Sequence, residues 1–125
     1  MGPQGVLVLS SQVETTLVDA LVSIGFSPLV RGSIQSALDR IRREKFAAIV
    51  VDQKRVKVDV LEFILNVRDI DAEIPVLVVG PSQGEPSYKT LQRLDNTVIL
   101  QEFQSAESLA KGLQSASRAY RARDA

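Results

Sequence analysis

The sequence predicts an α/β domain in which a parallel sheet is covered by helices on both faces. Five short apolar runs, each typical of a buried strand, alternate with five segments in which apolar residues recur at helical spacing. The longest run, 46–51, ends abruptly at Asp52, as expected of a central strand that is buried on both faces. Because short loops join these segments along 1–125, we expect a single three-layer domain.

The first predicted strand, 6–9, leads directly into a helix. Ser11 and Glu14 have the spacing of a capping box, in which the two side chains satisfy free N–H groups at the start of a helix. This helix is expected to end at Gly25, because glycine tolerates the left-handed conformation that commonly terminates helices.

A proline marks the second predicted strand, 27–30. Pro28 has no N–H to donate to a neighbouring strand, which favours a position at the edge of the sheet. Ser33 is then expected to cap a helix whose outer face is mostly charged at 40–45. The inner face of this helix carries the apolar residues Ile34, Leu38 and Ile41.

The carboxyl-terminal half continues the alternation after the central strand. Asp59 has the position of a helix cap, and a loop at 82–87 is marked by glycine, proline and serine. Much of one face of the helix after Asp59 is formed by Leu61, Ile64, Leu65 and Arg68. The remaining elements are a strand at 75–79, a short helix at 88–94, a strand at 97–100 and a helix that begins at Ser105.

Right-handed crossovers allow only a few orders for these strands, of which the flavodoxin-like order 2-1-3-4-5 suits this chain. The order places the strand that contains Pro28 at one edge. It also brings the ends of four strands to one rim, at Ser10, Asp52, Gly80 and Gln101. Open α/β sheets bind ligands outside the carboxyl ends of their strands, where the strand order reverses. The sequence therefore places a candidate site beside Ser10 and Asp52.

Composition argues against several classes of function. The chain has 15 basic and 15 acidic residues, and this net charge of zero argues against broad electrostatic binding to nucleic acid or to an anionic membrane. It has no cysteine for a disulfide and no histidine for a metal or acid–base site. No apolar run approaches the ~20 residues of a membrane span, and the first residues do not have the pattern of a signal peptide. We therefore expect a cytoplasmic protein whose domain binds neither membrane nor nucleic acid.

Three segments and the order of the elements carry a resemblance to a known family. The segments are 46–52, 61–64 and 74–78, and the similarity extends over nearly the whole chain. In these features the chain resembles the receiver domains of bacterial two-component response regulators, the CheY-like family. The resemblance implies the flavodoxin-like fold, and it implies that Asp52 corresponds to the aspartate that accepts a phosphoryl group from a histidine kinase. In such receivers two acids after the first strand help bind magnesium, and a hydroxyl residue and a lysine contact the phosphoryl group.

The chain departs from this pattern around Asp52. Ser10 and Ser11 replace the two acids, Gly80 replaces the hydroxyl residue, Gln101 replaces the lysine, and Val98 replaces an aromatic residue of the fifth strand. Magnesium typically takes carboxylates among its oxygen ligands, so one aspartate with two hydroxyls is a poor site for it. Loss of one electrostatic contact of the lysine's kind commonly costs ~10²-fold or more in rate. We therefore expect a degenerate receiver (a pseudo-receiver) with no catalytic residue, no cofactor and weak or absent magnesium binding.

Two interpretations of Asp52 remain open. In the first, its carboxylate is structural and accepts hydrogen bonds from loop N–H groups or hydroxyls. In the second, a cation from the following loop neutralises it, and Lys54 and Arg55 are the first candidates, because a buried carboxylate needs a partner. Such a pair would mimic an occupied metal site and hold the domain in one state.

The expected function is that of an atypical receiver domain of a two-component signalling or transcription regulator. It would act without aspartyl phosphorylation, through an attached output domain, a protein partner, or a homodimer formed by the last strand and its flanking helices. The basic tail from about residue 118 is either the start of a linker to an output domain, a dimer contact, or a solvated helix end. The main alternative is a working phosphoacceptor modified at Asp52, and a third is a sensor that binds a small ligand or nucleotide near Ser10 and Gly80.

Overall fold

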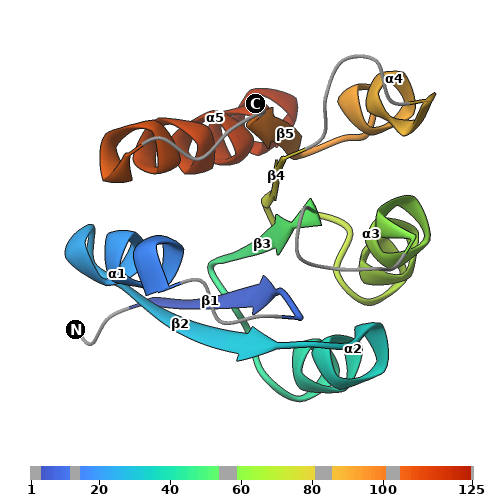
Figure 1. Cartoon of the computed structure of the whole chain (residues 1–125). Helices are drawn as coiled ribbons and strands as arrows, with labels where there is room; N and C mark the ends of the chain where they lie inside the picture. Colours follow the sequence, from blue (N-terminus) through green and yellow to red (C-terminus); the bar gives the residue numbers. More distant parts are fainter. Residues whose placement is uncertain (1–3, 12–14, 54–58, 81–85, 101–104, 125) are drawn as a thin grey trace.

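The computed structural model shows five parallel strands in one sheet with helices on both sides (Figure 1). It describes residues 4–11, 15–53, 59–80, 86–100 and 105–124, with the backbone alone at 15, 86–87 and 117–124. The described strands are β1 (Gln4–Leu9), β2 (Phe26–Arg31), β3 (Ala48–Asp52), β4 (Val76–Val79) and β5 (Thr97–Leu100). The described helices are α1 (Thr15–Ser23), α2 (Ile34–Arg43), α3 (Val60–Ile70), α4 (Pro86–Gln92) and α5 (Ala106–Asp124).

The strand order β2-β1-β3-β4-β5 confirms the predicted flavodoxin-like topology. Every neighbouring pair is parallel, and β3 lies at the centre of the sheet. The strand that contains Pro28 is at one edge, where an outward-facing position needs no ladder hydrogen bond. The strand predicted at 97–100 has the observed bounds of β5. By contrast, β3 begins two residues after the start of the apolar run 46–51 from which it was predicted.

Side-chain caps begin the helices as their sequences predict. The Ser33 hydroxyl accepts the Ser36 N–H at 3.2 Å, and the Asp59 carboxylate accepts the Glu62 N–H at 3.1 Å. Gly25 follows α1 with a φ of 96°, which confirms it as the residue that ends this helix. The capping box predicted for Ser11 and Glu14 includes a residue outside the described ones.

The helices divide between the two faces of the sheet. Figure 1 shows α1 and α5 on one side and α2, α3 and α4 on the other. Side chains alternate along each strand, so β1 sends Leu7 and Leu9 toward α2 and α3 and sends Val6 and Val8 toward α1 and α5. Two hydrophobic cores result, and the sheet separates them.

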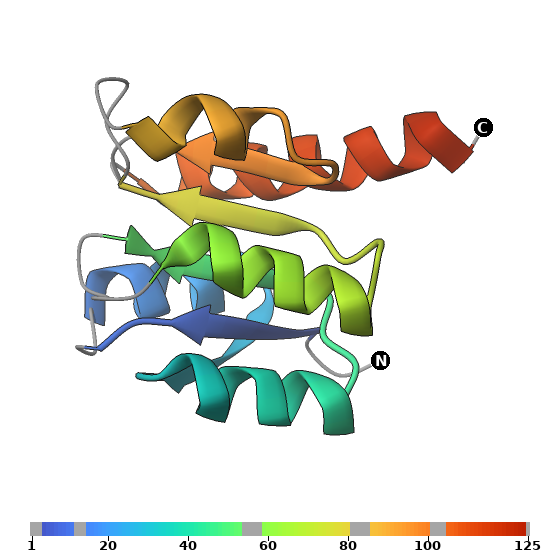
Figure 2. The ribbon, with the colours of Figure 1, turned by 90° about the vertical axis from the view of Figure 1, so that its right-hand side faces the viewer.

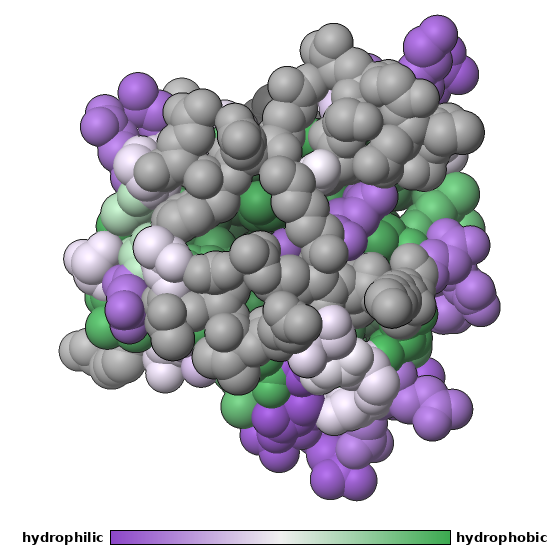
Figure 3. All heavy atoms as spheres, in the orientation of Figure 1, coloured by the Kyte–Doolittle hydropathy of each residue, from purple (hydrophilic) through white to green (hydrophobic). Residues whose placement is uncertain are grey.

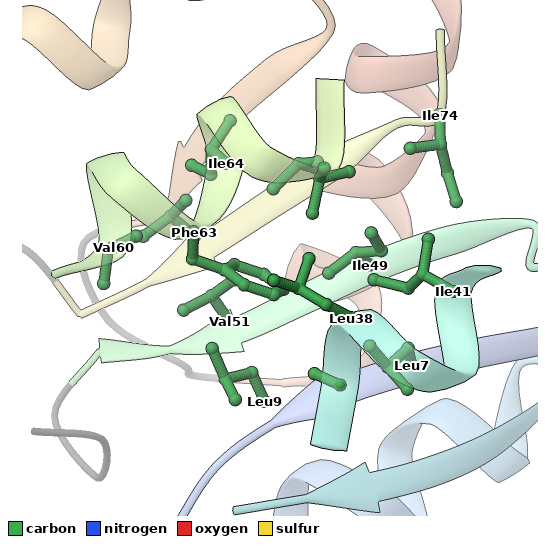
Figure 4. Close-up of a cluster of buried hydrophobic side chains, with 14 of the residues drawn as sticks. Leu7, Leu9, Leu38, Ile41, Ile49, Val51, Val60, Phe63, Ile64 and Ile74 are labelled. Atoms are coloured by element: carbon green, nitrogen blue, oxygen red, sulfur yellow. The ribbon is translucent and has the colours of Figure 1, made fainter. Parts of the chain in front are cut away.

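The larger core lies under α3, where Phe63 is fully buried. Figure 4 shows its ring extending from α3 toward the sheet, close to Val51 and Leu38. The buried face of α3 consists of Val60, Phe63, Ile64 and Val67, spaced as one stripe of a helix. Leu65, which the sequence groups with Ile64 on one face of this helix, is 51% exposed and lies outside the buried stripe.

The second core brings α5 very close to the sheet. A Cβ atom added at Gly112 would lie 2.9 Å from Leu77 Cδ1 of β4, so glycine permits this approach. Figure 2 shows α5 continuing past the amino-terminal edge of the sheet. None of the helices in the described part of the chain combines the length and the apolar character needed to cross a membrane.

Charged side chains occupy the outer surface of α2, as its sequence predicts. Arg43 pairs with Asp39 at 3.3 Å, and Arg40 pairs with Glu44, both across one helical turn. Figure 3 shows hydrophilic residues along the outer margin of the molecule over α2 and α3.

Candidate functional site

Asp52 is the last residue of the central strand and is buried. Its side chain and backbone together are 3% exposed, and in the sheet it lies beside Val79 of β4. The whole of β3 is buried, which agrees with the apolar run that precedes this aspartate. The carboxylate therefore lies at the carboxyl-terminal edge of the sheet, where the sequence places it.

Ser10 directly follows β1, the strand that lies beside β3. Leu9 is paired with Val51 and adjacent strands lie about 4.8 Å apart, so we infer that Ser10 and Asp52, which follow this pair, are close neighbours. Both continue the row of side chains that faces α1 and α5. Ser10 is 3% exposed, and its N–H donates to the carbonyl of Arg31 at 2.9 Å. This edge therefore brings a buried carboxylate and a buried hydroxyl-bearing residue together.

Gly80 and Ser11 complete the described part of this edge. Gly80 follows β4 with a φ of 111°, and its N–H donates to the carbonyl of Leu100 at 2.9 Å. A residue with a side chain would be strained in that conformation. This strain gives a local reason why glycine stands where the resemblance implies a hydroxyl residue. Ser11 is exposed. We call Ser10, Ser11, Asp52 and Gly80 the carboxyl rim.

Several predicted site residues lie outside the described ones. Gln101 comes directly after β5, and Lys54 and Arg55 come shortly after Asp52. Within the rim, Ser10, Ser11 and Asp52 each take part in at least one hydrogen bond, ion pair or other electrostatic interaction. Asp52 is thus a buried residue with at least one interaction partner.

The carboxyl rim does not fit a magnesium ion well. Magnesium needs near-octahedral oxygen ligands, usually with one or two carboxylates, and the rim supplies one carboxylate and two neutral hydroxyls. Across the described part of the chain, no three acidic, histidine or cysteine side chains come close enough to hold a metal ion.

Val98, the predicted replacement of an aromatic residue, packs inward. It is half-buried and contacts the core on the side of α1 and α5. It therefore contributes an aliphatic side chain to this core where the resemblance implies an aromatic ring.

Arg68 is a prominent residue whose role the sequence did not reveal. It lies at the opposite edge of the sheet, where its guanidinium donates to the backbone carbonyls of Ile74 and Asp95 at 2.6 and 2.7 Å. An arginine near the end of a helix usually suggests only a favourable interaction with the helix dipole. No local sequence pattern predicts that Arg68 contacts two separate turns.

Two grooves in the described part of the chain lie beside α2. A groove of about 700 Å³ runs between α2 and α3, and a smaller one of about 310 Å³ lies near the end of α2. The larger groove is lined by Ile34, Gln35, Ser36, Leu38, Asp39, Arg42, Glu62 and Asn66. This mixture of both charges with apolar residues identifies no class of ligand.

Comparison with known proteins supports the fold. No family model and no curated protein matches the sequence. Solved structures do match: the chemotaxis response regulator CheY4 of Vibrio cholerae has a TM-score of 0.76 and 18% identity, with 91% of this chain and 98% of that chain covered. The receiver domain of the sensor histidine kinase PA1611 from Pseudomonas aeruginosa has a TM-score of 0.77 and 18% identity, over 94% and 99%. In that structure a magnesium ion is coordinated in the active site cleft.

A third match belongs to a longer protein. NtrX from Brucella abortus, in complex with ATP, has a TM-score of 0.78 and 16% identity, over 98% of this chain but only 28% of that chain. Similarity at these identities establishes the fold alone. The chain therefore has the fold of response-regulator receiver domains, as the resemblance in its sequence implies.

Proposed function

We propose that this chain is a receiver-type signalling module that works by protein–protein contact and does not depend on phosphorylation of Asp52. The composition of the carboxyl rim is the observation that carries this proposal. Asp52 keeps the position of a phosphoacceptor, but its neighbour in the sheet is Ser10 and the residue after β4 is Gly80. The acceptor position is retained without the charged groups that phosphoryl transfer uses.

Phosphoryl transfer is catalysed mainly by positioning and by neutralising the charge on the transferred group with metal ions and cationic side chains. The described rim offers one carboxylate, two serines and a glycine, and Gln101 stands in the sequence where a lysine is expected. An efficient phosphoryl cycle is therefore not supported, and the proposed module is not an enzyme and needs no magnesium.

Incubation with acetyl phosphate and magnesium, followed by intact-mass measurement, tests this proposal. We expect no mass gain corresponding to one phosphoryl group, because the rim cannot neutralise the charge of the phosphoryl group. A receiver domain with a complete site serves as the positive control. A magnesium-dependent mass gain that disappears in Asp52→Ala would instead establish the alternative, a working phosphoacceptor.

The neutralisation of Asp52 by Lys54 or Arg55 forms part of the same proposal. Asp52 is 3% exposed, and an ionised carboxylate at that depth is costly without an opposite charge. We expect Lys54→Gln or Arg55→Gln to lower the free energy of unfolding by about 3 kcal/mol when Asp52 is present. In the Asp52→Asn background the loss should fall below about 0.5 kcal/mol, as for an ordinary surface change. Urea unfolding of the four proteins in each cycle measures this coupling, and additive effects for both cations would exclude the pair.

The partner contact is proposed to involve β5 and the helices that flank it. β5 is an edge strand, and all four of its residues are only half-buried. An output domain, a separate protein or a second copy of the chain are the partners that such a face would serve. Sedimentation equilibrium of the 125-residue chain distinguishes self-association from contact with another protein.

A further inference from the structure

The guanidinium of Arg68 joins two turns at the amino-terminal edge of the sheet. One nitrogen, Nη1, donates to the carbonyl of Ile74, just before β4, at 2.6 Å. The other, Nη2, donates to the carbonyls of Asp95 and Asn96, just before β5, at 2.7 and 3.2 Å. Nη2 also lies 3.3 Å from the hydroxyl of Thr97, the first residue of β5. A single side chain of α3 therefore holds the starts of both strands.

The turn before β5 is held in an unfavourable conformation. Asn96 has a φ of 55°, in the left-handed region that favours glycine. It is only 3% exposed, and its side-chain oxygen accepts no hydrogen bond from any described residue. Both features cost free energy, so contacts from outside the turn must stabilise it.

The same turn determines how β5 joins the sheet. The carbonyl of Asn96 accepts the N–H of Val76, the first residue of β4, at 2.9 Å. Because β5 is an edge strand, β4 is its one neighbour in the sheet, and the pairing between them covers four residues. A change in the turn would therefore act directly on the register or attachment of β5.

We propose that Arg68 is a conformational latch that holds the turn before β5 in its strained form and thereby keeps β5 in place on β4. The guanidinium is planar and carries five donors, so it can bridge two turns at once, which a lysine ammonium cannot do with the same geometry. Movement of the end of α3 away from the sheet would break all of these bonds together. This inference rests on the contacts of Arg68 and Asn96 and does not depend on the proposed function.

Hydrogen exchange of single amides, compared between the full-length wild-type chain and its Arg68→Gln variant, tests the latch. In Arg68→Gln, we expect the Val76 amide, which donates to Asn96, and the Gly80 amide, which donates to Leu100, to exchange about tenfold faster through local opening. The Ser10 amide, which donates to Arg31 on the far side of the sheet, is the reference and should change by less than about twofold. Equal acceleration of all three amides would show a uniform loss of stability and would overturn the proposal.

Two further variants separate a latch from a merely structural contact. Asn96→Gly removes both the left-handed strain and the buried amide, so in this background Arg68→Gln should accelerate Val76 by less than about threefold. An equally large acceleration in both backgrounds would show that Arg68 does not oppose strain in the turn. Arg68→Lys keeps the positive charge and can be measured even if Arg68→Gln does not fold. Its Val76 amide should exchange as fast as that of Arg68→Gln. Wild-type exchange in Arg68→Lys would mean that charge alone suffices and would contradict the bridging role.

Discussion

Ser10→Asp is expected to lower the free energy of unfolding by about 3 kcal/mol in metal-free buffer, because unit charges about 5 Å apart repel by roughly that amount at an effective dielectric constant near 20. The variant places a second carboxylate beside Asp52, and both positions are 3% exposed. Urea unfolding in the presence of EDTA measures the loss. Ser10→Asn is the matched control, because it has nearly the same size as aspartate without the charge.

Magnesium should then distinguish this variant from the natural chain. Two adjacent carboxylates are a reasonable pair of magnesium ligands, so the ion should stabilise Ser10→Asp, by about 2.7 kcal/mol when its concentration is roughly 100 times the Kd. The natural chain and Ser10→Asn should unfold at the same urea concentration with and without magnesium. If magnesium stabilised the natural chain as much as Ser10→Asp, the metal-independent function proposed for the carboxyl rim would be wrong.

Phe63→Ala is expected to lower the free energy of unfolding by about 3–5 kcal/mol, the usual cost of removing a fully buried aromatic ring. The ring lies between α3 and the sheet, near Val51 and Leu38 (Figure 4). Because small domains are stable by only about 5–15 kcal/mol, the variant should be marginally folded.

Substitutions at Leu65 and a conservative change at Phe63, both on α3, provide controls for the loss of stability expected in Phe63→Ala. Leu65 is 51% exposed, so Leu65→Ala should change the free energy of unfolding by less than about 0.5 kcal/mol. Phe63→Leu, which retains much of the buried volume, should cost less than about 1.5 kcal/mol. Thermal or urea unfolding of the three variants provides the comparison, and similar losses at Phe63 and Leu65 would contradict the assignment of the buried face of α3.

The order of the strands and the position of the rim could be predicted because their causes are local or topological. An apolar run that ends in a carboxylate identifies a buried central strand, and Pro28 identifies an edge strand because it lacks a donor. Ser33 and Asp59 begin their helices with bonds that span three residues. Once the strands are parallel, their carboxyl ends must meet at one edge, so Ser10, Asp52 and Gly80 gather there without any information on side-chain contacts.

The buried face of α3 was less certain from the sequence. Apolar residues lie on more than one side of this helix, and local spacing does not decide which stripe meets the sheet. Packing selects Val60, Phe63, Ile64 and Val67 and leaves Leu65 exposed. The burial of the large Phe63 ring against the sheet is the contact that the sequence pattern alone could not assign.

By itself, the sequence determined the α/β fold, the strand order and the replacement of the usual acidic and hydroxyl groups around Asp52, because each depends on residue type and on spacing along the chain. Tertiary structure alone decided that Asn96 is left-handed and buried. It alone decided that Arg68 reaches Asp95, 27 residues away. The physical reason is that hydrogen-bond donors and acceptors meet according to how helices and strands pack, and residue spacing does not record partners brought together from distant parts of the chain.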